Sequence, residues 1–245
     1  SWQRQPTHIH LGADVAELPQ IREVAHLLAA SDRPAALGTL LRVHQPASAL
    51  VFCNLKATVR ELTAYLLEQN FAVGALHGDL DQHERDRVMA KFRNGTVRVL
   101  VATDVAARGL DICGLAAVVQ YELAPKANTW LHRIGRTGRA GAEGLAIALV
   151  TPADVGRLRG REEATKADRG GGIERLPLPE ATAAKAPDAA NLQTLHIRGG
   201  RKDKLRPVDI LGALTGEAGL TGDAIGRIEI GDRTTYVGLQ PASLQ

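Results

Sequence analysis

Residues 49–76 read ALVFCNLKATVRELTAYLLEQNFAVGAL, and this stretch decides the fold. Its first five residues, Ala49–Cys53, are all apolar, as in a strand whose two faces are both buried. Apolar residues then recur at helical spacing, which predicts a helix over Lys56–Gln69. A second short apolar run predicts a strand over Ala72–Leu76. The stretch therefore predicts two parallel strands joined by a helix.

The same alternation of strands and helices continues along the chain. The further expected elements are strands over Arg98–Ala102, Ala117–Tyr121 and Leu145–Val150, and helices over Asp81–Phe92, from Lys126 onward and over Pro152–Lys166. Upstream, apolar residues recur at helical spacing over Leu18–Leu41 with a break at Pro34, which predicts two helices. THIHL at residues 7–11 predicts an extended segment. We therefore expect an α/β domain over residues 13–166, with a parallel sheet that helices cover on both faces.

The composition changes after residue 166. Residues 167–191 hold three consecutive glycines, several prolines and an alanine-rich run, so we expect them to form a linker. Residues 192–245 predict a small α+β unit with strands over Thr194–Arg198, Ile225–Ile230 and Thr234–Leu239 and a helix over Pro207–Thr215. This unit stops short of a second helix and a fourth strand, so we expect it to be incomplete. Residues 1–12 are expected to lead in from a preceding domain.

Length and composition limit the classes of function. A chain of 245 residues with 44% apolar side chains can bury a sizeable core. Its net charge of +3 permits a polyanionic partner without requiring one. Cys53 and Cys113 have no metal-ligand spacing, and we expect reduced, buried thiols in a cytoplasmic protein. No run approaches the ~18 apolar residues of a membrane span and no signal peptide opens the chain, so we expect a soluble monomer without a membrane partner.

The stretch His132–Arg139, HRIGRTGR, concentrates positive charge around two glycines. Arg136 and Arg139 are three residues apart, about one helical turn, so both guanidinium groups can converge on one anion. A triphosphate is such an anion, because arginine can stabilise the charge that spreads over the transferred phosphoryl group. The alternative is a basic helix end that faces solvent.

Polar residues follow two of the expected strands. Asn54 comes directly after ALVFC, where it can position a phosphate or hold the loop. LHGDLDQHERDRV, residues 76–88, places Gly78 before a helix start that carries Gln82 and Arg85. A glycine lets a backbone approach closely and a helix N-terminus favours phosphate, so Arg85 can contact a nucleic-acid backbone. The alternative is that Arg85 belongs to a solvated salt-bridge face.

A further strand ends in ATDVAARGLDI, residues 102–112. Thr103 supplies a hydroxyl and Gly109 a bend, while Arg108 and Asp111 lie in the same loop. An aspartate at a strand end commonly accepts a hydrogen bond from a ribose hydroxyl, so Asp111 is a candidate nucleotide ligand. A purely structural pair of Asp111 with Arg108 is the alternative.

VFCN, HGDLDQHER, ATDVAARGLDI and HRIGRTGRAG occur in this order. They resemble motifs IV, IVa, V and VI of the second RecA-like domain of DEAD-box RNA helicases. The resemblance implies that Arg136 and Arg139 act as arginine fingers, that Asp111 meets the ribose of ATP, and that His132 bridges to an acidic motif of the first domain. It also implies that Asn54, Gly78, Arg85 and Thr103 contact the RNA backbone, and we expect Gln82 and Gly109, which lie in the same motifs, to belong to the RNA site as well. One departure is Glu122 in QYELA, where the family usually has aspartate.

The tail from residue 195, LHIRGGRKDKLRPVDILGALTGEAGLTGDAIGRIEI, resembles the RNA-binding domain of DbpA-type helicases. That resemblance implies an RRM-like module that recognises a hairpin of large-subunit ribosomal RNA. The loop that joins its first strand and helix contains one acidic residue, Asp203, and five basic residues: Arg198, Arg201, Lys202, Lys204 and Arg206. This surplus suits phosphate neutralisation, and the alternative is a solubilising loop. RTTYVGL offers only Tyr236 for base stacking, so we expect recognition by loops and shape.

The sequence holds neither a GxxxxGK[ST] loop nor a DEAD-type acidic box. Both are needed to cradle phosphates and hold Mg²⁺. In the family that the chain resembles, they lie on the first RecA-like domain. We therefore expect the C-terminal part of an ATP-dependent RNA helicase for structured ribosomal RNA in ribosome assembly, with ATP and Mg²⁺ bound mainly by the first domain and no ATPase in this chain alone. A non-catalytic RNA-binding fragment and a DNA translocase are the alternatives.

Overall fold

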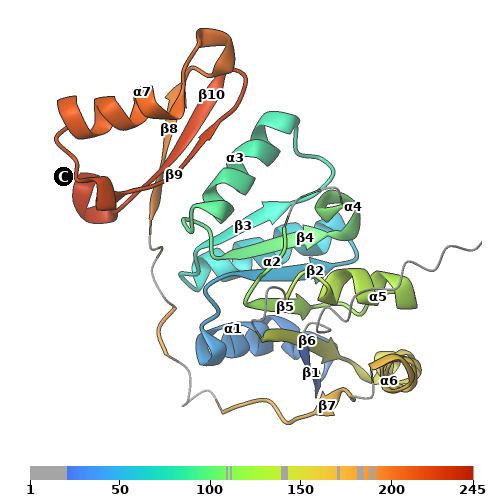
Figure 1. The fold of residues 1–245 in the computed structure, drawn as a ribbon. Coiled ribbons are helices and arrows are strands. Elements are labelled where there is room, and N and C mark those ends of the chain that lie inside the picture. Colours follow the sequence, from blue (N-terminus) through green and yellow to red (C-terminus); the bar gives the residue numbers. More distant parts are fainter. Residues whose placement is uncertain are drawn as a thin grey trace, which may run out of the picture.

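Two sheets organise the chain (Figure 1). In the computed structural model, residues 21–108, 110, 112–138, 143–169, 172–180, 185–187, 190 and 192–244 are described. Seven parallel strands form the first sheet in the order β3-β4-β2-β5-β6-β1-β7, and we call this part the core domain. Three antiparallel strands form the second sheet in the order β8-β10-β9, and we call residues 192–244 the tail. The expected α/β domain followed by a small α+β unit is confirmed.

The elements follow the predicted alternation closely. The strands of the core domain are β1 (Ile21–Leu27), β2 (Ala49–Cys53), β3 (Val73–Leu76), β4 (Val99–Thr103), β5 (Ala117–Gln120), β6 (Gly144–Val150) and β7 (Glu174–Arg175). Its helices are α1 (Arg33–His44), α2 (Lys56–Glu68), α3 (Gln82–Arg93), α4 (Asp104–Ala107), α5 (Ala127–Ile134) and α6 (Val155–Arg169). The tail contains β8 (Gln193–Arg198), α7 (Pro207–Gly212), β9 (Ile225–Ile230) and β10 (Thr234–Leu239).

Helices cover both faces of the core sheet, as the apolar strands predict. All residues of β2 and β4 are buried, because these strands lie inside the sheet and have helices on each side. Apolar side chains of α1 and α2 pack on one face. Those of α3 and α4 pack on the other, where α5 and α6 cover β1 and β6. None of the helices in the described part of the chain has the length and apolar composition that crossing a membrane requires.

The prediction of two helices over Leu18–Leu41 is wrong in its first half. Ile21–Leu27 forms β1, which pairs in parallel with β6 on one side and β7 on the other. Its apolar residues also match helical spacing, but the sheet supplies backbone partners on both edges, and this pairing overrides the local pattern. The second half forms α1, with Pro34 in its first turn. The extended segment expected at residues 7–11 lies outside the described residues.

Three smaller findings concern the predicted linker and the thiols. Within residues 167–191, Glu174–Arg175 adds β7 to the edge of the core sheet, where Glu174 pairs with Arg22 at 2.9 Å. Cys53 is buried, and burial raises the pKa of its thiol, which keeps it protonated. Cys113 is exposed, so the prediction that both thiols are buried is wrong for Cys113. It lies in a loop outside the strands, where no helix covers it.

Candidate nucleotide and RNA site

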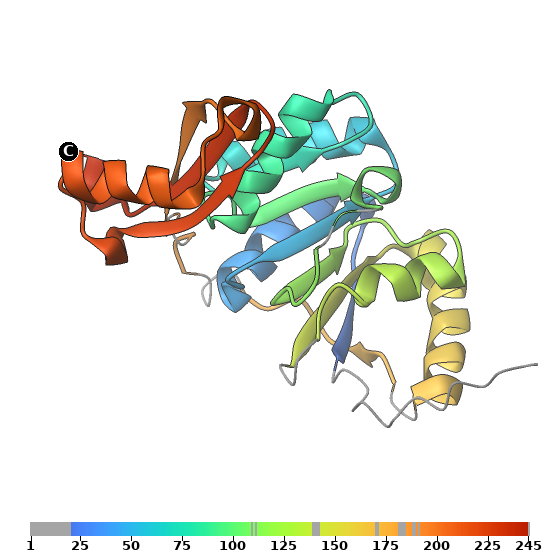
Figure 2. The ribbon, with the colours of Figure 1, turned by 45° about the horizontal axis from the view of Figure 1, so that its top comes forward.

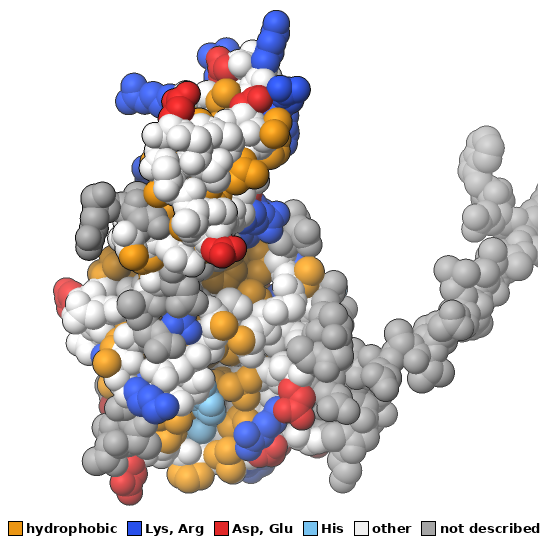
Figure 3. All heavy atoms as spheres, turned by 60° about the vertical axis from the view of Figure 1, so that its left-hand side comes forward, with side chains coloured by type: hydrophobic (Ala, Val, Ile, Leu, Met, Phe, Trp, Pro, Cys, Tyr) orange, Lys and Arg blue, Asp and Glu red, His pale blue; other side chains and the backbone are white. Residues whose placement is uncertain are grey.

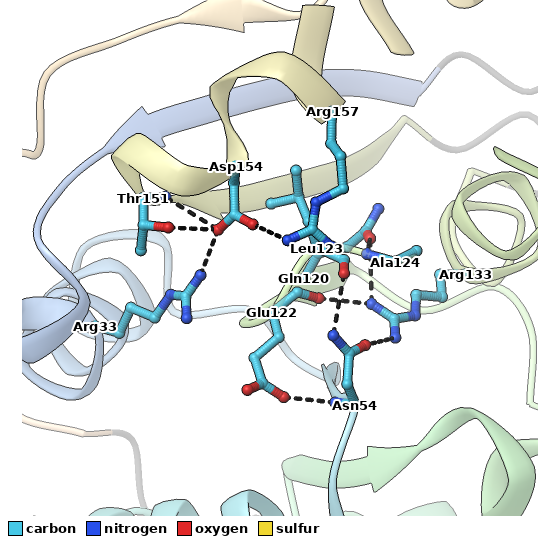
Figure 4. Close-up of polar contacts among 10 residues, drawn as sticks. All are labelled: Arg33, Asn54, Gln120, Glu122, Leu123, Ala124, Arg133, Thr151, Asp154 and Arg157. Carbon is cyan, nitrogen blue, oxygen red and sulfur yellow. Dashed lines mark hydrogen bonds and ion pairs between the residues drawn. The ribbon is translucent and has the colours of Figure 1, made fainter. Parts of the chain in front are cut away.

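Arg133 is a buried arginine whose nitrogens are all bonded to the protein. Its side chain is 1% exposed, and Nε and Nη2 donate to the two carboxylate oxygens of Asp104, each at 2.8 Å. Nη2 also donates to Asn54 Oδ1 (2.7 Å), and Nη1 donates to the Glu122 carbonyl (2.7 Å) and to Gln120 Oε1 (3.3 Å) (Figure 4). A guanidinium has five N–H donors, and this environment uses them all. Arg133 therefore joins the ends of β2, β4 and β5 and is not free for a ligand.

Asn54 is held by the same network. Its Nδ2 donates to the Leu123 carbonyl (3.1 Å), and its backbone N–H donates to the Glu122 carboxylate (2.6 Å) (Figure 4). The side chain thus fixes the loop after β2, which is one of the two roles that the sequence left open. Glu122, the departure from the family pattern, serves as the acceptor for this loop. The RNA contact expected for Asn54 stays a prediction.

A second polar cluster fixes α1 and the start of α6 beside this network. Asp154 accepts from Arg33 Nη2 and from Thr151 Oγ1, each at 2.7 Å, and also from Arg157 (Figure 4). Burial raises the pKa of Asp154, but the Thr151 hydrogen bonds and the charges of Arg157 and Arg33 together lower it. The carboxylate is therefore ionised at neutral pH and is fully used as a structural acceptor.

A pocket of about 270 Å³ opens where α4 and α5 meet the end of β2. Its lining consists of Phe52, Asp104, Ala107, Arg108, Thr129, His132, Arg133 and Arg136. Asp104 is neutralised by Arg133, so the remaining charged groups among the described lining residues are the cations Arg108 and Arg136, with His132 beside them. A pocket with this lining suits an anion. It lies at the carboxyl ends of parallel strands, where ligands of open α/β sheets bind.

The backbone after α5 aims Arg136 at this pocket. Arg136 Nη1 donates to the carbonyls of Leu110 and Ile112 at 3.3 Å each, and its Nε and Nη2 have no hydrogen-bond partner among the described residues. Gly138 has φ +68°, and a Cβ at Gly144 would lie 2.4 Å from the Gly138 nitrogen. Both glycines are therefore required for this turn to pass close to β6.

The structure brings some of the predicted nucleotide residues together. His132 is exposed and Arg136 is partly buried, and both line the pocket. Arg139, Asp111 and Gly109 lie outside the described residues, so their expected roles stay predictions. Arg108 and Thr129 also line the pocket. The sequence pointed to Arg108 only as a partner of Asp111, and its position inside the motif ATDVAARGLDI was the signal that could have marked it as a pocket residue.

The residues predicted to contact RNA occupy the ends of β3 and β4 and the start of α3. Gly78 is exposed, and a Cβ there would meet no heavy atom within 4 Å. Thr103 is buried at the end of β4. Gln82 donates to Asp86 at 2.7 Å, while Arg85 Nη2 donates to the Ala106 carbonyl at 2.9 Å. No ion pair of Arg85 occurs among the described residues, which disfavours the alternative of a salt-bridge face.

The basic loop of the tail carries less net charge in three dimensions than in sequence. Arg201 and Lys202 lie 3.9 and 3.6 Å from Asp232, which follows β9. Arg206 pairs with Asp209 at 3.0 Å in the first turn of α7. Figure 3 accordingly shows Asp and Glu side chains among the Lys and Arg side chains at the top of the tail. Two carboxylates outside the loop thus reduce its local surplus of four charges to two.

Two family profiles match the chain. Residues 32–141 match the "helicase conserved C-terminal domain", and residues 194–244 match the "DbpA RNA binding domain". The ATP-dependent RNA helicase DbpA of Escherichia coli is 42% identical over 244 residues, which cover 98% of this chain and 51% of that protein. The chain thus spans about half the length of the curated DbpA relatives that it matches.

Solved structures of DEAD-box proteins share the fold of the core domain. The E. coli DEAD-box protein SrmB, solved with the regulator RraA, is 30% identical with a TM-score of 0.60 and covers 69% of this chain and 96% of that one. Saccharomyces cerevisiae Dbp5 bound to RNA and ADP BeF3 is 33% identical with a TM-score of 0.58 and covers 66% of this chain and 42% of that one. Together with the two profiles, these matches show that the chain belongs to the DEAD-box family, in its DbpA subfamily.

Proposed function

We propose that this chain supplies one wall of the ATP site and the RNA-binding tail of an ATP-dependent RNA helicase. The observation that carries the proposal is the cationic pocket, where Arg136 and Arg108 lie beside His132 and the one carboxylate among the described lining residues, Asp104, is already neutralised. The relatives named ATP-dependent RNA helicase DbpA and the structure of Dbp5 with RNA and ADP BeF3 support it.

The pocket fits phosphate oxygens. ATP supplies the phosphoryl group, and this chain supplies fixed donors around the place where negative charge develops. Arg136 and, by the sequence motif, Arg139 donate to γ-phosphate oxygens, while Asp111 accepts from the ribose. Arg133 holds the surrounding loops in position and does not touch the nucleotide. His132, which is exposed, is free to reach an acidic residue of a first RecA-like domain.

The described residues do not fit Mg²⁺. Mg²⁺ prefers carboxylate oxygens, but Asp104 is bonded to Arg133 through both of its oxygens. No group of three or more His, Cys, Asp or Glu side chains that could hold a metal occurs in the described parts of the chain. We therefore assign Mg²⁺ to the first RecA-like domain.

The RNA side of the proposal uses the neighbouring strand ends and the tail. Gly78, Gln82, Arg85 and Thr103 are close in the fold to the end of β4, and we assign them to the backbone of one RNA strand. The basic loop and the match to the DbpA RNA-binding domain support recognition of structured RNA, which we take to be a ribosomal RNA hairpin during ribosome assembly. We further propose a cytoplasmic monomer.

Reconstitution tests the proposal. Neither this chain nor a separately produced first RecA-like domain of E. coli DbpA should hydrolyse ATP at a measurable rate, whereas their mixture should show RNA-stimulated ATPase. The first-domain protein with its P-loop lysine replaced is the matched control. A mixture that stays inactive while this chain still binds RNA would favour a non-catalytic RNA-binding fragment. Stronger stimulation by DNA duplexes than by ribosomal RNA would favour a DNA translocase.

A further inference from the structure

The tail sheet lies between two helices, α7 on one side and α3 of the core domain on the other (Figures 1 and 2). Toward α7 it presents an apolar cluster that includes Ile210, Val237 and Leu239. Because side chains alternate along a strand, Tyr236 and Gly238 point to the opposite face, toward α3. Tyr236 is only 5% exposed, so α3 covers this second face.

Polar contacts hold this interface, which we call the α3–tail interface. Arg93 at the end of α3 pairs with Glu229 of β9 at 2.9 Å, and Arg227 pairs with the same carboxylate. The Thr96 hydroxyl donates to the Leu192 carbonyl (2.8 Å) and lies 2.7 Å from the Thr194 hydroxyl. A partly exposed ion pair contributes little. These contacts therefore orient the tail more than they stabilise it.

The same interface is poorly filled. Two pockets of about 500 Å³ each, both open to solvent, flank the ion pair, and both are lined by Arg93 and Arg227. Each of the four apolar clusters formed by described residues lies wholly in the core domain or wholly in the tail. Apolar burial, the main source of stable association, is thus largely missing where the two parts meet.

Asn94 adds a cost to docking. It directly follows α3, is 3% exposed, and neither its Oδ1 nor its Nδ2 has a hydrogen-bond partner among the described residues. Gly238 of β10 lies against it, since a Cβ on Gly238 would be 3.3 Å from the Asn94 Cγ. A buried amide without partners loses its hydration and gains nothing in return. Water can reach this amide again when β10 moves away.

We propose that the tail docks reversibly on α3 and that the unpaired amide of Asn94 keeps the docked arrangement weak. In the docked arrangement, α3 covers the face of Tyr236, which stacks on His196 with ring centroids 5.1 Å apart. In the released arrangement, this ring pair and the Asn94 amide are hydrated. This docking joins the tail to α3, the helix that carries Gln82 and Arg85. It does not depend on the proposed ATPase.

The test measures docking in the whole chain without RNA or nucleotide. Backbone ¹⁵N relaxation reports the rotational correlation times of the core sheet and the tail sheet, which are equal when the tail is docked and differ when it is released. Asn94→Leu keeps the branching of the side chain and removes its polar atoms, so it should shift the ratio of docked to released chains about tenfold toward docking. Arg93→Gln and Thr96→Val should each shift that ratio toward release.

Asn128→Leu is the matched control, because Asn128 is exposed on α5, and it should leave both correlation times unchanged. The proposal is overturned if the tail of the native protein tumbles as one body with the core domain. It is equally overturned if Asn94→Leu leaves the difference between the two correlation times unchanged or enlarges it. Because the readout needs neither RNA nor ATP, its failure is distinguishable from failure of the proposed helicase function.

Discussion

Arg133→Ala should destabilise the core domain more than any other single change in the HRIGRTGR motif. The substitution removes both bonds to Asp104 and leaves the Asn54 side-chain oxygen and the Glu122 carbonyl without this donor, while Gln120 Oε1 keeps only the Ala124 backbone N–H. It also removes the guanidinium that lies 5.0 Å from the centre of the Phe52 ring. The loops after three strands lose their common partner.

The size of the effect follows from the burial of these groups. Removing one partner of a buried ion pair costs about 3–5 kcal/mol, and each unpaired neutral acceptor about 1 kcal/mol more. The Asp104 side chain is 22% exposed, so water can hydrate it in the variant and reduce this sum. We therefore expect the free energy of unfolding to fall by about 4–6 kcal/mol, a large share of the 5–15 kcal/mol that is typical of a domain.

Urea unfolding followed by Trp130 fluorescence measures the effect. Trp130 is buried one turn before Arg133 and donates to Glu23 of β1, so its emission reports on this part of the fold. Arg136→Ala is the control, because with the described residues it loses only two bonds of 3.3 Å, and it should cost less than about 1 kcal/mol. A loss below about 1 kcal/mol for Arg133→Ala, or equal losses for both variants, would refute the structural role of Arg133.

Three further predictions concern RNA and pH. Gly78→Ala should leave the free energy of unfolding unchanged, since the new methyl group meets no heavy atom within 4 Å. It should weaken RNA binding about tenfold in filter-binding assays if a phosphate approaches this backbone. Unchanged affinity would remove Gly78 from the RNA site. Lys204→Ala should flatten the dependence of log affinity on log salt by about one unit, and Arg206→Ala by less because Asp209 already neutralises it; equal slopes for both variants and the native protein would make the basic loop a solvated surface. Burial lowers the pKa of His26 from 6.5, so its contribution to stability is present above about pH 6.5 and is lost as pH falls below it; His26→Gln should flatten the pH dependence of the urea midpoint between pH 7 and about pH 5, and an unchanged profile would contradict this.

Much of the core sheet could be predicted because its signals are local. ALVFC is apolar throughout, and the predicted strand has the same bounds as β2. Pro34 breaks the upstream pattern and lies in the first turn of α1. Ile21–Leu27 could not be assigned in this way, because its spacing fits a helix and only its pairing with β6 and β7 makes it a strand.

The candidate site, like the core sheet, could be predicted only where its signals are local. The motif resemblance predicted that Arg136 and His132 serve the ATP site, a role that stays a prediction although both line one pocket, and the sequence could not show that Asp104 pairs with Arg133, 29 residues away. Nor could it show that Asp232 lies across from the basic loop, since only the turn after β9 brings the two together. Contacts between distant segments decide which charges are available to a ligand, and these are absent from any local window.

RNA-stimulated ATP turnover of the reconstituted enzyme, with native chain and with Arg136→Ala, tests the central claim most directly. We expect the variant to lower kcat by about 10³-fold or more and to leave the RNA affinity of the tail nearly unchanged. Arg139→Ala should behave in the same way. Turnover by Arg136→Ala within about threefold of the native rate, or equal losses of turnover and RNA affinity, would contradict the assignment of this pocket to the phosphates of ATP.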